Sequence, residues 1–214
     1  MDVQVIIIIA ILGYGLGNFQ TGLIVGKIRG LSDVREHGSG NAGATNMLRV
    51  YGYRAGIVTF LGDAAKCALA VLIGHVLGKA IGLMDGDAEL SALLGGYIGG
   101  FTCIVGHCWP ALFAFRGGKG SSCTFAFLCA TFPLGAGIVA AVLIAVYLIS
   151  KRVSVVSIVG AVVFIALTFI FRRNYPYYQI ASIAYVAVVL LRHIPNIIRL
   201  IRGTEKELHR EKSE

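Results

Sequence analysis

Long apolar runs separated by short polar segments make up almost the whole chain. Because a helix of about 20 apolar residues crosses the hydrocarbon core of a bilayer, runs of this length predict transmembrane helices. The runs that we predict as crossings are residues 3–25, 55–77, 90–115, 121–132, 136–149, 153–171 and 177–191. No basic stretch precedes the first run and no A-x-A-like site closely follows it, so we expect a retained helix rather than a signal peptide.

The fourth run, 121–132, is shorter than the others and ends at Pro133-Leu134-Gly135. A straight helix of about 12 residues does not cross a core of about 30 Å. It is either a seventh, short crossing or a re-entrant half-helix beside protein or a water-filled cavity. We predict an all-α integral membrane protein with about seven transmembrane helices and a short broken helix after the loop 117–120, forming one polytopic domain over residues 1–214.

Composition supports membrane insertion. The chain is 57% hydrophobic and only 14% charged, whereas soluble domains carry roughly 25% charged residues. The formal net charge is +8, but the Lys and Arg residues lie between the apolar runs rather than on one face of a helix. We find no nucleic-acid-binding motif, so these cations are interpreted as topology signals.

The distribution of Lys and Arg predicts the orientation. One face receives Lys27, Arg29, Arg35, Arg49, Arg54, Arg116, Lys119, Lys151, Arg152 and the tail from Arg192 onward. The other face carries Lys79, Arg172 and Arg173 together with Asp2, Asp85, Asp87 and Glu89. The positive-inside rule then places the amino terminus outside and the carboxyl tail in the cytoplasm, with the Arg172-Arg173 pair as the one exception.

This topology brings four polar segments rich in glycine or serine to the cytoplasmic face of the plasma membrane. They are residues 37–49, 116–121, 151–157 and 192–205. Four separate segments meeting on one face predict a binding or catalytic site there.

The first segment runs from His37 to Arg49 and contains three glycines and four Ser, Thr or Asn side chains. Glycines let successive backbone N–H groups face one anion, and hydroxyl and amide side chains add donors. Arg49 is suited to a bidentate contact with phosphate. The alternative interpretation is a flexible loop at the membrane interface.

The second segment, Arg116-Gly117-Gly118-Lys119-Gly120-Ser121-Ser122, resembles a phosphate-binding loop in its residue types. It opens a predicted helix, whose N-terminus favours anions. The Walker A spacing is absent, so the loop does not imply nucleotide hydrolysis. A cationic stop signal followed by a turn is the alternative.

The last segment places His193 and Asn196 where the seventh run reaches the cytoplasm, with Arg199, Arg202 and Glu205 after them. The two side chains at i and i+3 can face one ligand. A juxtamembrane basic helix on anionic lipid is the alternative.

Within the second run, Asp63 and Lys66 are spaced i, i+3 and are expected to neutralise each other, as a structural pair or as a substrate contact. His75 and His107 have no second ligand at metal spacing, and we interpret both as core histidines. The five cysteines show no CxxC spacing and are interpreted as small apolar residues.

Motifs of other enzyme classes are missing. The sequence has no G-x-S-x-G and no H-E-x-x-H. The cytoplasmic segments offer donors and cations but almost no carboxylates for a metal, so we expect no metal and no cofactor. Such a site suits an anionic substrate that is already activated.

These motifs in this order resemble the bacterial acyl-phosphate glycerol-3-phosphate acyltransferase family. The resemblance rests on Gly38-Ser39-Gly40-Asn41-Ala42-Gly43-Ala44-Thr45-Asn46 with Arg49, Gly106-His107 with Pro110, Gly117-Gly118-Lys119-Gly120, Ser154, Arg192-His193, Asn196-Ile197, Arg199-Leu200, Gly203 and Glu205. Ile194 and Pro195 stand where the family often has an Arg and an acidic residue. Cys67 stands where a Gly usually follows the intramembrane lysine.

The resemblance implies transfer of a fatty acyl group from acyl phosphate to the sn-1 hydroxyl of glycerol 3-phosphate. The products are lysophosphatidate and inorganic phosphate, at the entry to phospholipid synthesis. Membrane lipids surround such a protein, and the enzyme that makes acyl phosphate is a candidate partner. A membrane transporter of phosphorylated solutes is the alternative, although we find no internal repeat.

The chemistry assigns roles to the polar residues. The acyl phosphate headgroup is expected at Gly117, Gly118, Lys119, Gly120, His193 and Asn196, of which Lys119, His193 and Asn196 are the predicted catalytic residues. Glycerol 3-phosphate is expected at Ser39, Asn41, Thr45, Asn46 and Arg49, with Ser154 bridging the two. The proton acceptor is either His193 or a phosphate oxygen of the substrate, and the resemblance favours the substrate.

Overall fold

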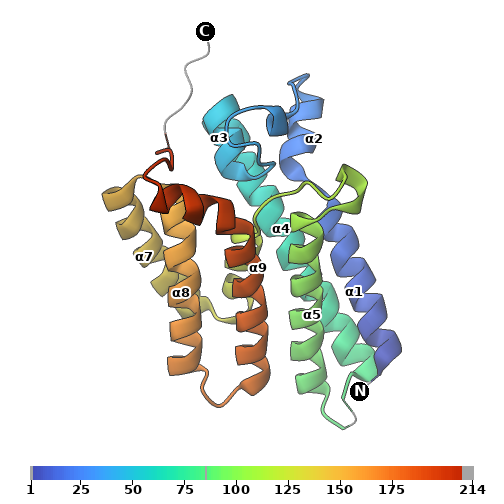
Figure 1. The fold of residues 1–214 in the computed structure, drawn as a ribbon. Helices are drawn as coiled ribbons and strands as arrows, with labels where there is room; N and C mark the ends of the chain where they lie inside the picture. The colour runs from blue at the N-terminus through green and yellow to red at the C-terminus, as the bar shows by residue number, and fades with distance from the viewer. Residues whose placement is uncertain (1, 85, 209–214) are drawn as a thin grey trace.

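The computed structural model describes residues 2–84 and 86–208, and every regular element in these ranges is a helix (Figure 1). Asp85, counted above among the acidic residues, and the tail beyond 208 lie outside the described residues. The main helices are α1 (Val3–Asn18), α2 (Thr21–Ile28), α3 (Ala44–Tyr51), α4 (Tyr53–Leu77), α5 (Ala88–Cys108), α6 (Ser121–Thr131), α7 (Pro133–Ser150), α8 (Val153–Phe171) and α9 (Pro176–Ile201). Three single-turn elements, η1 (Val34–Glu36), η2 (Gly78–Gly82) and η3 (Ala111–Phe113), lie between them.

Within residues 2–84 and 86–208, six helical segments are long and apolar enough to cross a membrane. They are Val3–Ile28, Tyr53–Gly82, Ala88–Phe113, Pro133–Ser150, Val153–Phe171 and Pro176–Ile201. Helix α6, the predicted short crossing, has 11 residues and is about 16 Å long at 1.5 Å per residue. The broken helix after the loop 117–120 is therefore present, whereas the count of seven crossings stays a prediction.

In three places the helices differ from the predicted runs. The first run is divided at Phe19-Gln20 into α1 and α2, because buried side chains described below take the backbone carbonyls at the break. The third run stops at Cys108 instead of residue 115, since Pro110 cannot donate a helical hydrogen bond. The last run does not end at residue 191 but continues as α9 through Pro195 to Ile201.

Helices α1, α4 and α5 pack closely because glycines face each other at their contacts. Gly74 of α4 and Gly95 of α5 lie against each other's backbone, and a Cβ atom on either would overlap the other's carbonyl oxygen. Gly17 of α1 lies against Gly106 of α5, where added Cβ atoms would overlap the carbonyl oxygens of Cys103 and Tyr14. Small residues allow helix backbones to approach in this manner.

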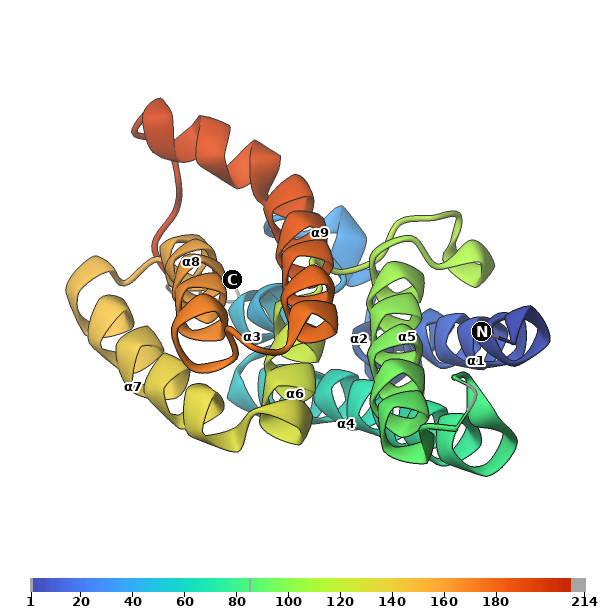
Figure 2. The same ribbon diagram turned by 90° about the horizontal axis from the view of Figure 1, so that it is seen from below.

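Helices α6 to α9 form a second group beside α1, α4 and α5, as Figure 2 shows from below. The aromatic ring of Phe127 stacks on Tyr185 with ring centroids 3.9 Å apart, in a core shared by α5, α6, α8 and α9. The guanidinium of Arg172 lies 4.8 Å from the ring centre of Phe132 and donates to the carbonyl of Thr131. Arg172 belongs to the Arg172-Arg173 pair that was the exception to the positive-inside rule. Its contacts at the end of α6 give it a structural role there.

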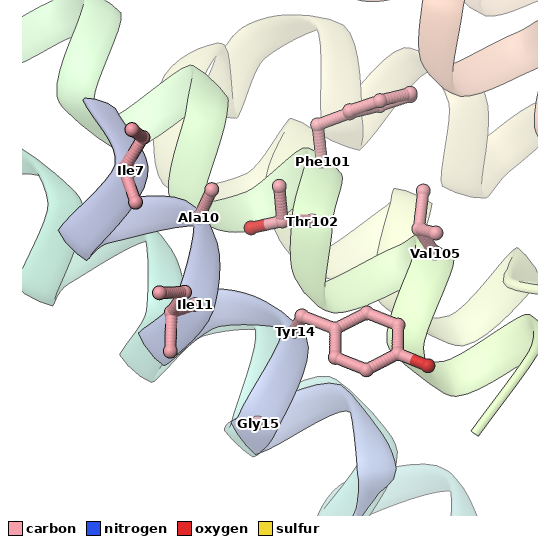
Figure 3. Close-up of a pocket in the computed structure, with 8 residues that line it drawn as sticks. All are labelled: Ile7, Ala10, Ile11, Tyr14, Gly15, Phe101, Thr102 and Val105. Atoms are coloured by element: carbon pink, nitrogen blue, oxygen red, sulfur yellow. The ribbon is translucent and has the colours of Figure 1, made fainter. Parts of the chain in front are cut away.

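A separate apolar groove of about 600 Å³ lies between α1 and α5 (Figure 3). Its two hydroxyl groups are already bonded, that of Tyr14 to the carbonyl of Trp109 and that of Thr102 to the carbonyls of Ile98 and Gly99. The groove therefore presents an apolar wall suited to lipid chains.

The contact between Gly74 and Gly95 gives a stability prediction. Gly74→Ala is expected to lower the unfolding free energy by about 1–3 kcal/mol, because the new methyl group must push α4 and α5 apart. Gly137→Ala on α7 is the matched control, since its Cβ would meet no atom within 4 Å. Thermal unfolding of both variants in detergent measures the difference, and equal midpoints would contradict the close-packing argument.

Candidate active site

A cavity of about 570 Å³ is lined in part by residues of α3 and the loop before it, at the end of the bundle where Figure 1 shows α2 and α3. All four polar segments reach it, although they are far apart in the sequence. Its polar lining includes Ser39, Asn41, Thr45, Asn46, Arg49, Asp63, His107, Lys119, Ser121, Ser122, Ser154, Ser157, His193, Asn196, Arg199, Thr204, Glu205 and Lys206. Apolar side chains of α4, α6, α7 and α8 line the remaining wall. The cavity therefore has a polar chamber and an apolar chamber that are continuous with each other.

Asn46 organises the glycine-rich loop of the first segment. Its Oδ1 accepts from the backbone N–H of Ser39 at 2.8 Å, and its Nδ2 donates to the carbonyls of Val34 and His37 at 2.9 and 3.0 Å. The side chain is 1% exposed. The structure thus places Asn46 at the cavity wall with its amide engaged in shaping the loop.

Asn41 connects this loop to the second segment. Its Oδ1 accepts from the N–H of Gly43 at 2.8 Å, and its Nδ2 donates to the carbonyl of Gly117 at 3.4 Å. The hydroxyl groups of Ser39 and Thr45 line the cavity, and neither donates or accepts a hydrogen bond within the described part of the chain. These two hydroxyls are available to a ligand.

Arg49 is a buried cation in the cavity wall. It lies in the last turn of α3, is 8% exposed, and forms no hydrogen bond or ion pair with residues 2–84 or 86–208. Burying a charge is unfavourable unless a partner compensates it. An anionic ligand in the cavity would supply that partner.

Gly117 and Gly118 take a different position from the one expected for phosphate-binding glycines. Both are buried against His107, whose carbonyl accepts from the N–H of Gly118 at 3.0 Å. Arg192 donates to both their carbonyls. Neither glycine lines the cavity; they hold the loop so that Lys119 and Gly120, the next residues, do.

Lys119 projects from this loop toward α9, where its Nζ donates to Oδ1 of Asn196 at 2.7 Å. Burial lowers the pKa of Lys119 to about 8. This value already includes the effect of Glu205, which raises the pKa, and of the cations Arg199, Arg192 and Arg49, which lower it. Because an opposite charge favours the charged form of a lysine, an anionic ligand beside Lys119 would stabilise its ammonium.

His193 and Ser154 complete the far wall. His193 is 3% exposed, and its Nδ1 lies 2.7 Å from the carbonyl of Val189. Because a carbonyl only accepts, Nδ1 carries the proton, and Nε2 of the neutral ring is a hydrogen-bond acceptor. Ser154 is 7% exposed at the start of α8 and also lines the cavity.

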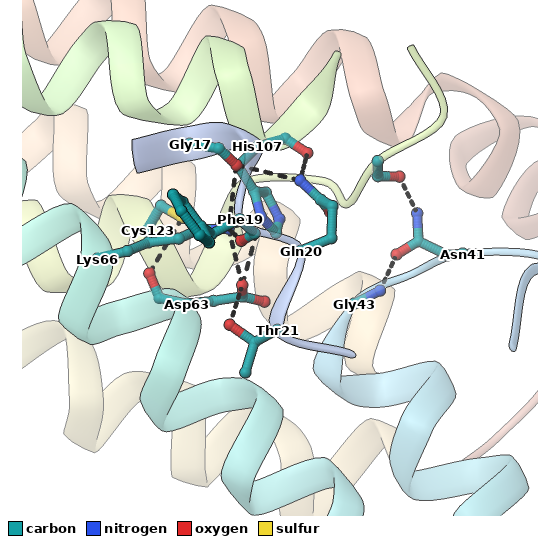
Figure 4. A network of polar contacts seen from close by, with 11 residues as sticks. Gly17, Phe19, Gln20, Thr21, Asn41, Gly43, Asp63, Lys66, His107 and Cys123 are labelled. Carbon is teal, nitrogen blue, oxygen red and sulfur yellow. Dashed lines mark hydrogen bonds and ion pairs between the residues drawn. The ribbon is translucent and has the colours of Figure 1, made fainter. Parts of the chain in front are cut away.

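Asp63 and Lys66 form the expected pair at 2.9 Å, beneath the cavity (Figure 4). The ammonium of Lys66 also reaches the carbonyl of Phe19 and Nδ1 of His107, the latter at 2.9 Å. Thr21 donates to the carboxylate of Asp63 at 3.1 Å. The two side chains thus neutralise each other as expected, and Asp63 and His107 also contribute to the cavity lining.

Two residues of this region were not assigned from the sequence. Gln20 donates to the carbonyls of Gly17 and His107, each at 3.1 Å, and so stabilises the break between α1 and α2. The sequence signal that could have indicated this break was an amide residue inside an apolar run. Glu205 lines the cavity from the segment after α9, and its place in the last motif was the signal there.

A family model described as glycerol-3-phosphate acyltransferase matches residues 7–203. The glycerol-3-phosphate acyltransferase of Clostridioides difficile (strain 630) is 38% identical over 99% of this chain and 100% of its own length. The enzyme of the same name from Neisseria meningitidis serogroup A is 37% identical over 91% of this chain and 93% of its own length.

Two crystal structures of PlsY, an integral membrane glycerol 3-phosphate acyltransferase, have the same fold. Its glycerol 3-phosphate form matches with a TM-score of 0.82 and 29% identity, covering 95% of this chain and 96% of that one. Its lysophosphatidic acid form matches with a TM-score of 0.78 and 28% identity over 94% of each chain. The all-helical membrane fold expected from the sequence is confirmed.

The buried ion pair generates a second prediction. Asp63→Asn is expected to lower the unfolding free energy by about 3–5 kcal/mol, because it leaves the ammonium of Lys66 buried without its counter-charge. The double variant Asp63→Leu/Lys66→Met should recover part of this loss, since neither charge remains. Thermal unfolding in detergent tests both.

The control is Glu89→Gln, which breaks the exposed pair with Lys79 and should leave the unfolding midpoint unchanged. An Asp63→Asn protein as stable as the wild type would show that the pair does not hold the fold.

Proposed function

Because the chain belongs to the glycerol-3-phosphate acyltransferase family, we propose that it transfers a fatty acyl group from acyl phosphate to the sn-1 hydroxyl of glycerol 3-phosphate. The products would be lysophosphatidate and inorganic phosphate. The observation that carries this proposal is the cavity itself, where the unpaired buried Arg49 and the ammonium of Lys119 face an apolar chamber. A lipid-forming reaction between two phosphate-bearing substrates needs both kinds of wall.

The lining supports two separate phosphate positions. Arg49 with the free hydroxyls of Ser39 and Thr45 suits the phosphate of glycerol 3-phosphate, the ligand that the PlsY structure holds. Lys119 with Asn196 suits the phosphate of the donor. Ser154 lines the same cavity and is assigned to bridge the two.

The mechanism needs no covalent enzyme intermediate, because acyl phosphate is a mixed anhydride with a good leaving group. The sn-1 oxygen of glycerol 3-phosphate attacks the acyl carbonyl carbon, and the bond from that carbon to the phosphate oxygen breaks. The hydroxyl proton goes to the departing phosphate. Holding both substrates in place supplies much of the acceleration, and fixed donors that stabilise the oxyanion supply the rest.

His193 is proposed to orient the attacking hydroxyl. Its Nδ1 is committed to the carbonyl of Val189, so Nε2 accepts a hydrogen bond from the hydroxyl. A phosphate oxygen of the substrate then takes the proton. His193 in this role aligns the nucleophile without becoming a general base.

The orientation in the membrane completes the proposal. The charge distribution favours a cavity that opens to the cytoplasm, where glycerol 3-phosphate is a water-soluble acceptor. The apolar side chains Leu143 and Ile144 of α7 line the cavity and suit the acyl chain of the donor. The reaction would form the first acylated lipid of phospholipid synthesis, and the enzyme that makes acyl phosphate is a candidate partner.

Purified protein given acyl phosphate and glycerol 3-phosphate is expected to release equimolar inorganic phosphate and lysophosphatidate. Acyl-coenzyme A in place of acyl phosphate should give no product, and Lys119→Ala should lower kcat/KM at least 10²-fold while the protein stays folded. Product from acyl-coenzyme A alone would refute the donor assignment. Passage of glycerol 3-phosphate across a vesicle membrane without acyl transfer would establish transport instead.

His193→Gln tests the proton acceptor. Glutamine retains a hydrogen-bond acceptor but is not a base, so turnover should fall by about tenfold or less if a substrate phosphate takes the proton. A loss of about 10²–10⁴ at every pH, with the affinity for glycerol 3-phosphate intact, would instead make His193 the general base. His193→Ala, which removes both functions, is the matched comparison.

A further inference from the structure

The chain after α9 turns back over the cavity as a strap, residues 202–208. Gly203 has a positive φ of 70°, and the N–H of Thr204 bonds to the carbonyl of Arg199 at 2.8 Å, which reverses the chain direction. At its other end, the N–H of Leu208 donates to the carbonyl of Lys151 at 2.9 Å. The strap is thus attached to α9 and to the junction of α7 and α8.

The strap delivers Glu205 to the cavity. Its Oε1 accepts from Nδ2 of Asn196 and its Oε2 accepts from Nε of Arg199, each at 2.7 Å, and the side chain is 9% exposed. Asn196 in turn accepts from the ammonium of Lys119 at 2.7 Å. A carboxylate, an amide and an ammonium therefore form one continuous chain of hydrogen bonds.

The direction of this chain follows from the chemistry of its members. A carboxylate only accepts hydrogen bonds and an ammonium only donates them. Glu205 therefore holds the NH2 group of Asn196, which leaves the amide oxygen facing Lys119. Without the carboxylate, the amide would lose the partner that sets its orientation.

Glu205 also balances the charges around Lys119. Arg49 faces the ammonium from α3, and Arg192, His193 and Arg199 face it from α9. His107 and the neutral pair of Asp63 and Lys66 lie at the floor. Glu205 favours the ammonium form of Lys119, whereas Arg199, Arg192 and Arg49 oppose it.

We propose that Glu205 is a positioning residue that, through Asn196, keeps the Lys119 ammonium charged and directed into the donor phosphate site. The strap is thereby a component of the active site, although Glu205 itself need not touch the substrate. The test by activity rests on the proposed acyl transfer, whereas the role of Glu205 toward Lys119 does not. The rival is that Glu205 merely anchors the strap.

The pH dependence of kcat/KM separates these possibilities, because this parameter reports ionisations of the free enzyme. With its pKa near about 8, Lys119 is charged below that pH and neutral above it, so wild-type kcat/KM should decline above about pH 8. In Glu205→Gln the lysine loses its proton more readily. The decline should move to lower pH by on the order of one unit, which is about a tenfold loss at alkaline pH and little change at pH 6.

Lysine labelling provides a readout that needs no substrate. An amine-reactive reagent modifies only the neutral amine, and mass spectrometry of the Lys119 peptide across pH gives its titration in the unliganded protein. The labelling curve of Glu205→Gln should shift with the activity curve. If wild-type protein transfers no acyl group, the proposed function fails, and the labelling curve still decides the role of Glu205.

Two further variants complete the test. Glu89→Gln removes an exposed carboxylate paired with Lys79 outside the cavity and should match the wild type in both curves. Glu205→Asp keeps the charge and should shift both curves less than Glu205→Gln; it replaces that variant if the glutamine protein does not fold. Wild-type labelling and activity curves in the folded Glu205 variants would overturn the proposal.

Discussion

A lysine ammonium buried inside a membrane protein must find acceptors, and Lys66 finds them in the carboxylate of Asp63, Nδ1 of His107 and the carbonyl of Phe19. The last of these is available because α1 ends at the Phe19-Gln20 break. His107 in turn accepts from the N–H of Gly118 through its own carbonyl. The ion pair is thus connected through hydrogen bonds to the break between α1 and α2 and, through His107, to the loop that carries Lys119.

The charges are compensated at the floor of the cavity, near Asp63 and Lys66, but not in the polar chamber above it, at Arg49 and Lys119. At the floor the charge of Lys66 is matched by Asp63. In the chamber, Arg49 has no partner among residues 2–84 and 86–208, and Lys119 bonds only a neutral amide there. The charges at the floor compensate each other, whereas the cations above it would be stabilised by an anionic ligand.

Helix α9 links this chamber to the rest of the bundle. Its membrane part contributes Tyr178 and Tyr185 to the aromatic core, and its extension beyond residue 191 brings His193 and Asn196 to the cavity. Because both parts belong to one helix, packing in the core sets the position of these two cavity-lining side chains. The strap then adds Glu205 from the same helix end.

The sequence by itself determined the helical membrane class, the short α6 and the meeting of four polar segments, because apolar length, glycine content and charge are local properties. It also singled out Arg49, Lys119, His193 and Asn196, which the structure brings to one cavity, while their roles toward a substrate stay predictions. Only the tertiary structure decided that the Asn46 amide and the Gly118 N–H bond to backbone groups of the protein, and that Gln20 lies at a helix break. Those outcomes depend on partners such as Val34 and His107, and hydrogen bonds to distant backbone atoms leave no periodic pattern in a sequence.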